Sequence, residues 1–411
     1  MKSDLDKLMK KNDVDVLFII GSASHNPSMN YFVGTAHVSD AIFIKPRGKS
    51  AVLFHYPMER EEAAKSGLKL VSLNRYPMAE YLQQAAGNYA EAFVLRLKAL
   101  LESMNVHSGR VGLYGKDDVG PFYAVITRLQ ELMPELHFTG FVRDEILLNA
   151  MMTKDTEELD RIREMGKITT GVVGKVADYL TGHKTRNDTL IHRDGSPVTI
   201  GEVKNLINLW LAEKGVENPE GTIFAIGRDA GIPHSAGTHT DPIQLGKTFV
   251  FDIYPCEAGG GYFYDFTRTW SLGYATDDVQ ALYDQVKQVY ETLYNELKVN
   301  QPFYLYQERT CDLFEALGHP TIKTDPAIEA GYVHSLGHGV GLRVHEKPWA
   351  STINPSPTDI LAPGSVFTLE PGLYYPDRGM GVRIEDTLYV SPEGQFEILA
   401  DFSKDLVLPV K

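Results

Sequence analysis

Three histidines stand within the short segment HSLGHGVGLRVHE, which begins at His334, contains His338 and His345, and ends at Glu346. The whole chain has thirteen histidines, so this segment is enriched in them. Imidazoles bind metals and act as general acids or bases near neutral pH. Histidines alone do not separate a site from coincidence, so carboxylates or thiols elsewhere in the chain must complete a metal or catalytic site.

Four carboxylates lie in runs of strand-forming residues. They are Asp252 in KTFVFDIYP, Asp265 in YFYDFTRTW, Glu370 in SVFTLEPGLYY and Glu385 in GMGVRIEDTLYV. Because side chains alternate along a strand, each run has an apolar face and a face with a carboxylate. If those faces met water, the strands would be ordinary amphipathic strands. If the faces converge, the acids repel one another and need cations.

The segment from Asp252 to Asp265 reads as strand, glycine-rich turn and strand. It predicts a hairpin that could set the two aspartates side by side, which is destabilising without a shared cation. With Glu370, Glu385 and one histidine they form an oxygen-rich set that suits a pair of Mn²⁺, Co²⁺, Fe²⁺ or Zn²⁺ ions. Two such ions can hold a bridging hydroxide and polarise a carbonyl group.

The elements that must position these residues fall into two regions. In residues 1–150, strand-like runs such as DVLFII, AIFIKP, SAVLFHY and RVGLYG alternate with helix patterns, which predicts an α/β domain. The segment NPSMNYFVGT, between the first two strands, is predicted as a loop because of its turn residues. We place a domain boundary near residue 150, which leaves residues 151–411 as a second domain.

Helix signals open the second region. Asp155 and Glu158 form a capping box before a long amphipathic helix, and Thr199 and Glu202 predict a second box before another helix. From residue 221 onward strands dominate, and two further helix patterns interrupt them. The chain as a whole is therefore predicted to be α/β (α+β).

Composition excludes several classes of protein. The 411 residues are 43% hydrophobic and 23% charged, which is typical of globular proteins. A net charge of -14 argues against partners such as nucleic acid or a membrane surface. The two cysteines form no CxxC motif, which suits a reducing compartment. The sequence shows no signal peptide or membrane-spanning run, so we expect a cytoplasmic protein.

The order Asp, Asp, His, Glu, Glu in these contexts resembles the pita-bread metallopeptidases, which include aminopeptidase P, prolidase and methionine aminopeptidase. The resemblance includes IPHSAG and the helix TKDTEELDRIREMGKIT, and it covers nearly the whole chain. It implies a creatinase-type N-terminal α/β domain in residues 1–150, for dimerisation and substrate access. It also implies a C-terminal pita-bread catalytic domain in residues 151–411, with a curved antiparallel sheet flanked by helices.

The resemblance also implies two divalent metal ions in each chain, with manganese expected and cobalt, zinc or iron as alternatives. Asp252 would bind one metal, Asp265 and Glu385 would bridge both, and His338 and Glu370 would hold the other. Asp252 and Asp265 are thirteen residues apart, two more than is usual in the family, and the surplus falls in EAGGG. Two extra residues at a turn leave the strand pairing unchanged, so the expected ligands stand.

Further site residues come from the same resemblance. His234 and His345 are expected to contact the substrate or stabilise the tetrahedral intermediate, and Glu370 to shuttle a proton as well as bind metal. His334 and Arg383 are expected in substrate binding, and Arg383 would also orient the carboxylates.

The implied function is a dinuclear exopeptidase that hydrolyses the Xaa-Pro bond at the N-terminus of short peptides, by attack of a metal-bridging hydroxide, as aminopeptidase P does. Alternatives are an Xaa-Pro dipeptidase (prolidase) and a non-peptidase hydrolase or lyase on the same fold. A binding protein that has lost its site is a third, but such proteins usually lose ligands and none is missing here. We expect proline-containing peptides as partners and a homodimer.

Overall fold

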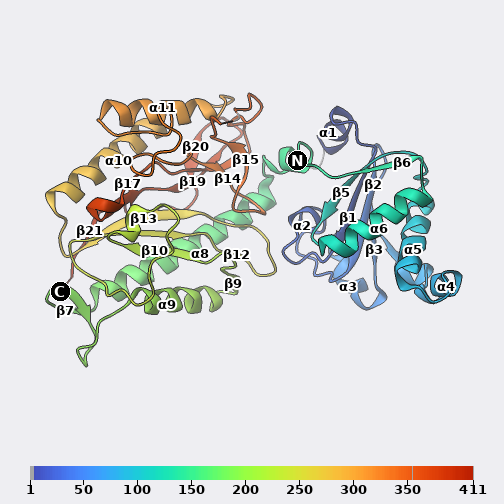
Figure 1. Ribbon diagram of the computed structural model, residues 1–411, viewed down its shortest axis with the longest axis horizontal. Helices are drawn as coiled ribbons and strands as arrows, with labels where there is room; N and C mark the ends of the chain where they lie inside the picture. Colours follow the sequence, from blue (N-terminus) through green and yellow to red (C-terminus); the bar gives the residue numbers. More distant parts are fainter. Residues whose placement is uncertain (1–3, 354, 411) are drawn as a thin grey trace. The chain divides into compact units, whose positions relative to one another are not determined.

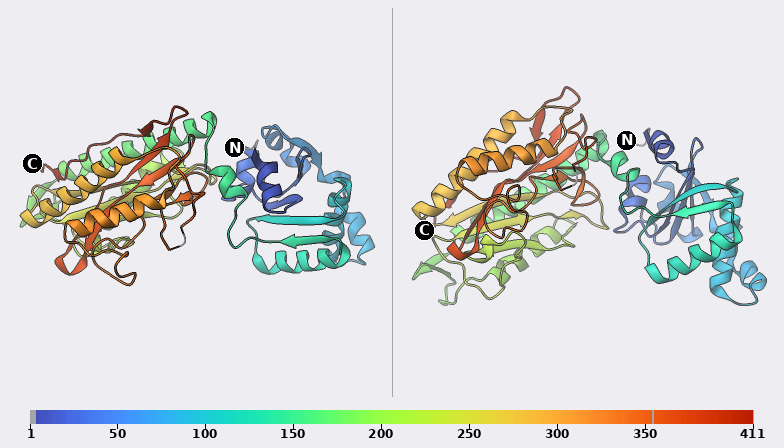
Figure 2. Two further views of the ribbon diagram at one scale, coloured as in Figure 1. Left: turned by 90° about the horizontal axis from the view of Figure 1, so that it is seen from above. Right: turned by 45° about the horizontal axis from the view of Figure 1, so that its top comes forward.

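The computed structural model describes residues 4–353 and 355–410, and the chain divides into two compact units. The first unit consists of Met1–Met151 and Gly259–Gly261, and the second of Met152–Ala258 and Tyr262–Lys411. Figures 1 and 2 show both units from three directions. Each unit has its own sheets and its own buried apolar core.

The first unit is built on a six-stranded sheet with the order β4-β3-β2-β1-β5-β6. Its strands are β1 (Val16–Gly21), β2 (Ala41–Pro46), β3 (Val52–His55), β4 (Lys69–Ser72), β5 (Gly109–Gly115) and β6 (Leu136–Thr139). The central strand β1 pairs antiparallel with β2 and parallel with β5, so the sheet is mixed. Its apolar residues are buried on both faces, which explains why these strands read as continuous hydrophobic runs.

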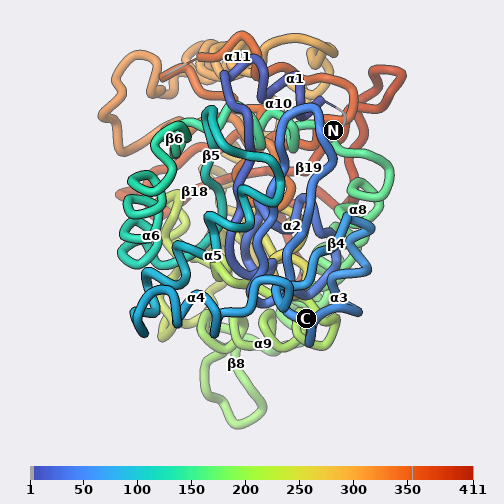
Figure 3. The backbone as a smooth tube through the Cα atoms, turned by 90° about the vertical axis from the view of Figure 1, so that its right-hand side faces the viewer, coloured from blue at the N-terminus to red at the C-terminus, as the bar shows by residue number. Residues whose placement is uncertain are grey.

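Helices cover both faces of this sheet, as Figures 1 and 3 show. They are α1 (Leu5–Lys11), α2 (Pro27–Val33), α3 (Arg60–Ala64), α4 (Met78–Gln84), α5 (Tyr89–Ser103), α6 (Val119–Leu132) and α7 (Leu147–Met151). Apolar residues of α5 and α6 share a core with one face of the sheet. On the other face, the Phe32 ring of α2 stacks on Phe43 of β2 at 4.2 Å between ring centroids.

The loop predicted for NPSMNYFVGT is wrong, because residues 27–33 form helix α2. Asn26 caps it by accepting a hydrogen bond from the Met29 amide at 3.3 Å, and Pro27 occupies the first turn. Proline and asparagine are favoured at a helix start as well as in turns, so the turn signal here marked a helix N-terminus.

In its described residues, the second unit contains four long helices. They are α8 (Thr156–Thr181), α9 (Ile200–Ala212), α10 (Asp277–Glu296) and α11 (Tyr304–Ala316). The capping box of Asp155 and Glu158 is present at the start of α8. The second predicted box is only half formed: Thr199 accepts a hydrogen bond from the Glu202 amide, but the Glu202 carboxylate instead accepts from Tyr179 and contacts His192.

Two larger sheets and one hairpin lie between these helices. The four-stranded sheet has the order β10-β11-β13-β21, the five-stranded sheet has the order β15-β14-β16-β19-β20, and β17 pairs with β18. Their bounds are β10 (Thr222–Ile226), β11 (Thr248–Ile253), β13 (Phe266–Leu272), β14 (His338–Gly339), β15 (Glu346–Trp349), β16 (Val366–Leu369), β17 (Gly372–Tyr375), β18 (Met380–Arg383), β19 (Asp386–Val390), β20 (Phe396–Ile398) and β21 (Val407–Leu408). The short strands are β7 (Lys184–Arg186), β8 (Thr189–Ile191), β9 (Val216–Glu217) and β12 (Cys256–Glu257).

Helices α8 and α9 lie on one outer side of these strands, and α10 and α11 lie on the opposite side (Figure 1). Apolar residues of α10 and α11 pack against β16 to β19 in one large core. A bridge between Thr267 of β13 and Glu385 joins the four-stranded sheet to the segment between β18 and β19. Among the described residues, no helix is long and apolar enough to cross a membrane.

The glycine-rich turn between β12 and β13 contributes Gly259–Gly261 to the first unit. The His25 amide donates to the Gly259 carbonyl oxygen at 2.8 Å, and the Asn30 amide group donates to that of Gly260 at 3.4 Å. Gly260 has a φ of +82°, and a Cβ atom there would lie 2.6 Å from the Cα of His25. Glycine is therefore required at this close approach.

Candidate metal centre and active site

The antiparallel pairing of β11 with β13 sets the relative positions of the two aspartates. Asp252 lies opposite Thr267, so Asp265, two residues earlier on the same face, is its diagonal neighbour. The predicted hairpin is present, and it brings the two aspartates to one face as diagonal neighbours rather than as a directly opposed pair. The register continues unchanged to the bridge between Cys256 and Phe263, so the longer turn does not disturb it.

The other three predicted ligands come from the five-stranded sheet and the segments that connect to it. Glu385 lies between β18 and β19, Glu370 directly follows β16, and His338 begins β14. Strand β14 pairs with β16, which brings the histidine near the end of the strand that leads to Glu370. Glu385 itself pairs with Thr267 of the four-stranded sheet, so this bridge brings the ligands of the two sheets together.

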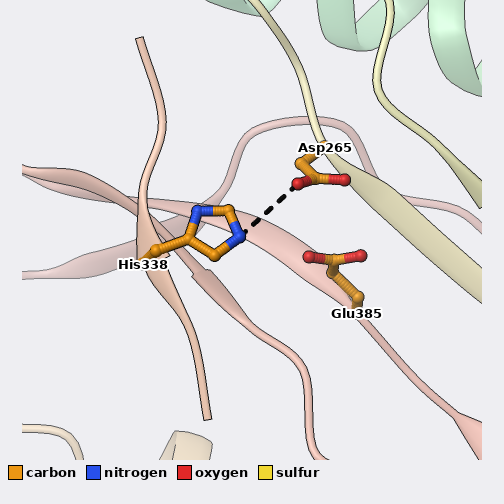
Figure 4. Close-up of side chains that lie close together, drawn as sticks. All are labelled: Asp265, His338 and Glu385. Carbon is orange, nitrogen blue, oxygen red and sulfur yellow. Dashed lines mark ion pairs between the residues drawn. The ribbon is translucent and has the colours of Figure 1, made fainter. Parts of the chain in front are cut away.

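Three of the predicted ligands form a compact buried group, which Figure 4 shows. One ligand atom each from Asp265, His338 and Glu385 lies within 4.8 Å of the others. The Nε2 atom of His338 is 3.6 Å from Asp265 Oδ2 and 3.3 Å from Glu370 Oε1. Three of the four predicted carboxylates thus lie around one imidazole ring.

The hydrogen bonds of His338 orient its ring toward these acids. Its Nδ1 lies 3.1 Å from the Gly339 carbonyl oxygen, which can only accept, so Nδ1 carries a proton. That leaves Nε2 as the atom that faces the carboxylates, which is the arrangement of a metal-binding histidine.

Burial and mutual repulsion shift the pKa values of these groups. Burial and the charge of Asp252 raise the pKa of Asp265 well above its usual range, and burial and the charge of Asp265 do the same for the pKa of Glu385. Burial alone would lower the pKa of His338, but its contacts with Glu370 and Asp265 raise it to about 9. Burial would raise the pKa of Glu370, but His338 lowers it to about 2.

Two buried oxygen atoms test whether these residues fit a metal. Asp252 Oδ1 and Asp265 Oδ1 are buried and have no hydrogen-bond partner in the described part of the chain. An unpartnered buried carboxylate oxygen is costly, and a divalent cation removes that cost. Four carboxylates and one imidazole also match the ligands that Mn²⁺, Co²⁺, Fe²⁺ and Zn²⁺ accept, so the residues fit a metal centre.

Arg383 connects Asp252 to two aromatic side chains. Its Nη2 atom is 2.5 Å from Asp252 Oδ2, and its Nη1 donates to the Tyr374 hydroxyl at 2.8 Å. That hydroxyl is 2.9 Å from Nε2 of His334, whose Nδ1 donates to the Ser335 carbonyl oxygen at 2.8 Å. His334 Nε2 is therefore the acceptor. Burial lowers the pKa of His334 to about 4, so the ring is neutral at neutral pH.

All nine predicted site residues line one cavity of about 540 Å³ in the second unit. They are His234, Asp252, Asp265, His334, His338, His345, Glu370, Arg383 and Glu385. The ring of His345 lies 4.3 Å from that of His338 between centroids. Burial and the charge of His338 lower the pKa of His345 to about 4. The structure thus gathers residues from widely separated parts of the sequence around one space.

Sequence reasoning missed three residues that hold this arrangement. Thr267 donates to Glu385 at 2.6 Å and accepts from Arg383 at 3.1 Å, so it links two of the predicted site residues. Tyr374 joins Arg383 to His334. Arg268, fully buried, donates to the Glu385 carbonyl oxygen at 2.7 Å. The sequence signal that could have identified Arg268 is its position between Phe266 and Trp270 on the apolar face of a strand, where a charged residue is unusual.

Comparisons with known proteins agree with this geometry. The model of Metallopeptidase family M24 matches residues 160–392. The chain is 25% identical to Xaa-Pro dipeptidase of Pyrococcus furiosus over 406 residues, which cover 96% of this chain and 97% of the relative. It is 30% identical to the putative dipeptidase YkvY of Bacillus subtilis over 278 residues, 66% of this chain and 68% of the relative.

Solved structures share the whole fold. The X-Pro aminopeptidase of Thermotoga maritima matches with a TM-score of 0.74 at 21% identity, over 98% of this chain and 99% of that one. The prolidase of Pyrococcus furiosus matches with a TM-score of 0.70 at 23% identity, over 97% of this chain and 100% of the other. The predicted fold class, an N-terminal α/β domain with a C-terminal pita-bread domain, is confirmed.

The family match covers more than half of the chain, and the predicted resemblance is confirmed. The chain belongs to metallopeptidase family M24 and is a metallo-exopeptidase of the pita-bread type.

Proposed function

We propose that this protein hydrolyses the Xaa-Pro bond at the N-terminus of short peptides with the help of two divalent metal ions. The observation that carries the proposal is the pair of buried, unpartnered oxygens of Asp252 and Asp265 in the described part of the chain, which belong to the same cavity wall as His338. Relatives named Xaa-Pro dipeptidase and X-Pro aminopeptidase support the choice of bond.

In this proposal Asp252 would hold one metal, His338 and Glu370 would hold the other, and Asp265 and Glu385 would contribute to both. Bound there, the metals would lower the pKa of a water molecule and polarise the scissile carbonyl group. Manganese is the proposed metal. The tautomer of His338, fixed by the Gly339 carbonyl oxygen, supports its role because it leaves Nε2 available.

The chain's own groups have separate roles. Glu370 accepts a proton from the attacking water and passes it to the leaving proline nitrogen. His345 and His234 line the cavity beside the acids and would contact the substrate or the tetrahedral intermediate. Arg383 holds Asp252 in place through its contact of 2.5 Å, and its charge opposes the rise that burial causes in the pKa of Asp252. His334 lines the substrate side of the cavity and is held by Tyr374.

A second candidate is an enzyme limited to Xaa-Pro dipeptides. It is favoured by the names of two relatives, the Xaa-Pro dipeptidase of Pyrococcus furiosus and the putative dipeptidase of Bacillus subtilis. In either case the first unit is proposed to support a homodimer and to restrict access to short peptides, and the protein is proposed to act in the cytoplasm.

Hydrolysis of Ala-Pro and Ala-Pro-Ala, with Mn²⁺ added to purified protein, tests both candidates. Cleavage of both peptides supports an aminopeptidase, and cleavage of Ala-Pro alone supports a dipeptidase. Failure to cleave either peptide, while metal analysis finds the protein loaded, would reject the proposal. His338→Ala is the matched control and should remove activity together with bound metal.

A further inference from the structure

The cavity wall contains charged residues that the proposed metal centre does not use. Lys204 of α9 and Glu220, which precedes β10, both line the cavity. Neither forms an ion pair among the described residues, where a pair is a nitrogen–oxygen distance of at most 4.0 Å. Charged groups that line a binding cavity without a partner are candidates for ligand recognition.

Lys204 is held in place but is not neutralised. Its side chain is half-buried, and its Nζ donates to the Ala236 carbonyl oxygen at 2.9 Å. An ammonium group has three N–H donors, so this bond leaves further donors available. Burial lowers the pKa of Lys204. The ammonium group has therefore lost part of its hydration, and no anion of the protein compensates for this loss.

Arg383, the other cation of the wall, differs in this respect. Each of the three nitrogens of its guanidinium group already donates a hydrogen bond, to Thr267, Tyr374 and Asp252. Lys204 is thus the cation of the described cavity wall that has no carboxylate of the protein within ion-pair distance.

Lys204 lies in the same cavity as the proposed reaction centre. Its bond partner Ala236 lies two residues after His234, and both residues line the cavity. Strand β10, which packs beside α9, places Ile223 directly opposite Asp252 of β11. Lys204, Ile223 and Asp252 all line the same cavity, so a substrate that fills this cavity can contact Lys204 as well as the metal centre.

Glu220 carries the opposing charge on this part of the wall. It is exposed, so water screens its charge more strongly than the charge of a half-buried group. Its charge contributes to the raised pKa of Tyr254, after burial and two aspartates, which places it near that side chain. Glu220 forms no ion pair with Lys204 among the described residues, so the ammonium group can still bind an anionic group.

We propose that Lys204 binds a carboxylate group of the substrate and thereby determines which peptides are cleaved. The proposal rests on the proposed peptidase function. The carboxylate has two sources: the free C-terminus of an Xaa-Pro dipeptide, or the side chain of an acidic N-terminal residue. Both present the same chemistry to the ammonium group, and a charge-assisted hydrogen bond holds either one.

Four substrates separate the sources: Ala-Pro, Ala-Pro-amide, Glu-Pro-amide and Gln-Pro-amide. We expect Lys204→Met to lower kcat/KM by about ten- to a hundredfold for the substrates that present the recognised carboxylate, because a hydrogen bond to a charged group is lost. The matched neutral amide should be unaffected. Lys204→Arg should restore most of the preference, because it keeps the positive charge.

Two variants serve as controls. Lys214→Met removes an exposed lysine just beyond the end of α9 and should change none of the four rates. Glu220→Gln removes the opposing charge and should raise, not lower, kcat/KM for the carboxylate substrates. Activity on Gln-Pro-amide reports folding and metal loading within each variant.

The four substrates give a different result for each source of the carboxylate. A selective loss on Ala-Pro assigns the C-terminal carboxylate, and a selective loss on Glu-Pro-amide assigns the acidic side chain. If each charged substrate and its neutral counterpart were cleaved at equal rates, by both the wild type and Lys204→Met, the proposal would be overturned while the peptidase function stands. If wild-type protein cleaves none of the four substrates, the proposed function itself fails.

Discussion

Buried acids lie on both faces of the same strands, but the two faces differ in the partners that they offer to these acids. Strands β13 and β19, each with the residue that precedes it, carry Asp265 and Glu385 on the cavity face, and Arg268 and Asp386 on what we call the back face. All four side chains are buried. Because these residues are close neighbours along the chain, the difference between the faces comes from the partners that each acid meets.

On the back face every charge has a partner. Arg268 lies 2.7 Å from one oxygen of Asp386 and donates to the Phe402 and Ser403 carbonyl oxygens. Lys404 lies 2.7 Å from the other oxygen of Asp386, and Tyr290 donates to it as well. On the cavity face, by contrast, the acids face one another and Asp265 Oδ1 has no partner among the described residues.

The contrast separates the acids that stabilise the fold through partners in the protein from the acids that require a bound ligand. The back face contains its own cations and needs nothing from solution. The cavity face is stable only when protons or metal ions offset its charges. Removing an acid should therefore have opposite consequences on the two faces.

The largest expected effect is on activity. Asp265→Asn should lower kcat by more than about a thousandfold, because metal binding supplies several kcal/mol of transition-state stabilisation. The metal-free variant should be at least as stable as the metal-free wild type, because an asparagine at this position needs no proton or cation to offset a buried charge. Peptide hydrolysis, metal content and urea unfolding measure these effects. Normal turnover would contradict the assigned site.

On the back face, Asp386→Asn should instead cost about 3–5 kcal/mol of unfolding free energy, because it leaves Arg268 buried without its anion. Urea unfolding of metal-free protein measures the loss. The double variant Arg268→Met, Asp386→Leu is the control and should cost less, since it removes the fully buried Arg268 together with its anion and leaves only the more exposed Lys404 without one. Equal costs for the single and double variants would show that the charges are not the cause.

A smaller effect concerns pH. The folded metal-free protein holds protons on Asp265 and Glu385 above their ordinary pKa, and on His338, whose pKa is raised to about 9. These three groups thus bind more protons in the folded state than in the unfolded state, whereas His334 and His345, whose pKa is lowered to about 4, bind fewer between about pH 4 and 6.5. Stability should therefore fall as pH rises above about 6.5, because the His338 contribution is full below the ordinary histidine pKa of 6.5 and is lost as pH rises through about 9.

Metal ions compete with these protons, so added Mn²⁺ should stabilise the protein more at about pH 8 than at about pH 5.5, by roughly 1–3 kcal/mol. Thermal unfolding at both pH values, with and without Mn²⁺, measures the difference. The Asp265→Asn variant should show a smaller difference. A larger gain at the lower pH would contradict the mechanism.

The smallest effect should come from an ion pair on the surface. Arg309 contacts Glu296 through two bonds of 2.8 and 2.9 Å, but both side chains are largely in water. Glu296→Gln should cost less than about 1 kcal/mol of unfolding free energy. A loss as large as that of Asp386→Asn would mean that burial does not explain the contrast between the faces.

The sequence was informative where an acid interrupts an apolar strand. Asp252, Asp265 and Glu385 were predicted in this way, and the structure places them around one cavity. It was less informative about register, which depends on pairing between strands and set Thr267 rather than Asp265 opposite Asp252. Local turn signals also misled for residues 27–33, because the same residue types begin helices.

Residues whose role depends on distant partners could not be predicted. Tyr374 and Thr267 are ordinary strand residues until the fold sets them beside Arg383. Lys204 follows the pattern of an exposed helical lysine, and only the packing of α9 beside β10 makes it part of the cavity wall. Its environment is a tertiary property that no local pattern contains.

The glycine turn that packs in the first unit has a consequence for the order of biosynthesis. Gly259–Gly261 belong to the first unit, but they are translated long after Met151, the last residue of its main segment. Domains generally fold from the N-terminus as the chain emerges, yet this one lacks a packing segment until the hairpin of the second unit is made. The first unit therefore gains this packing segment only after the strand that carries Asp252 has been synthesised.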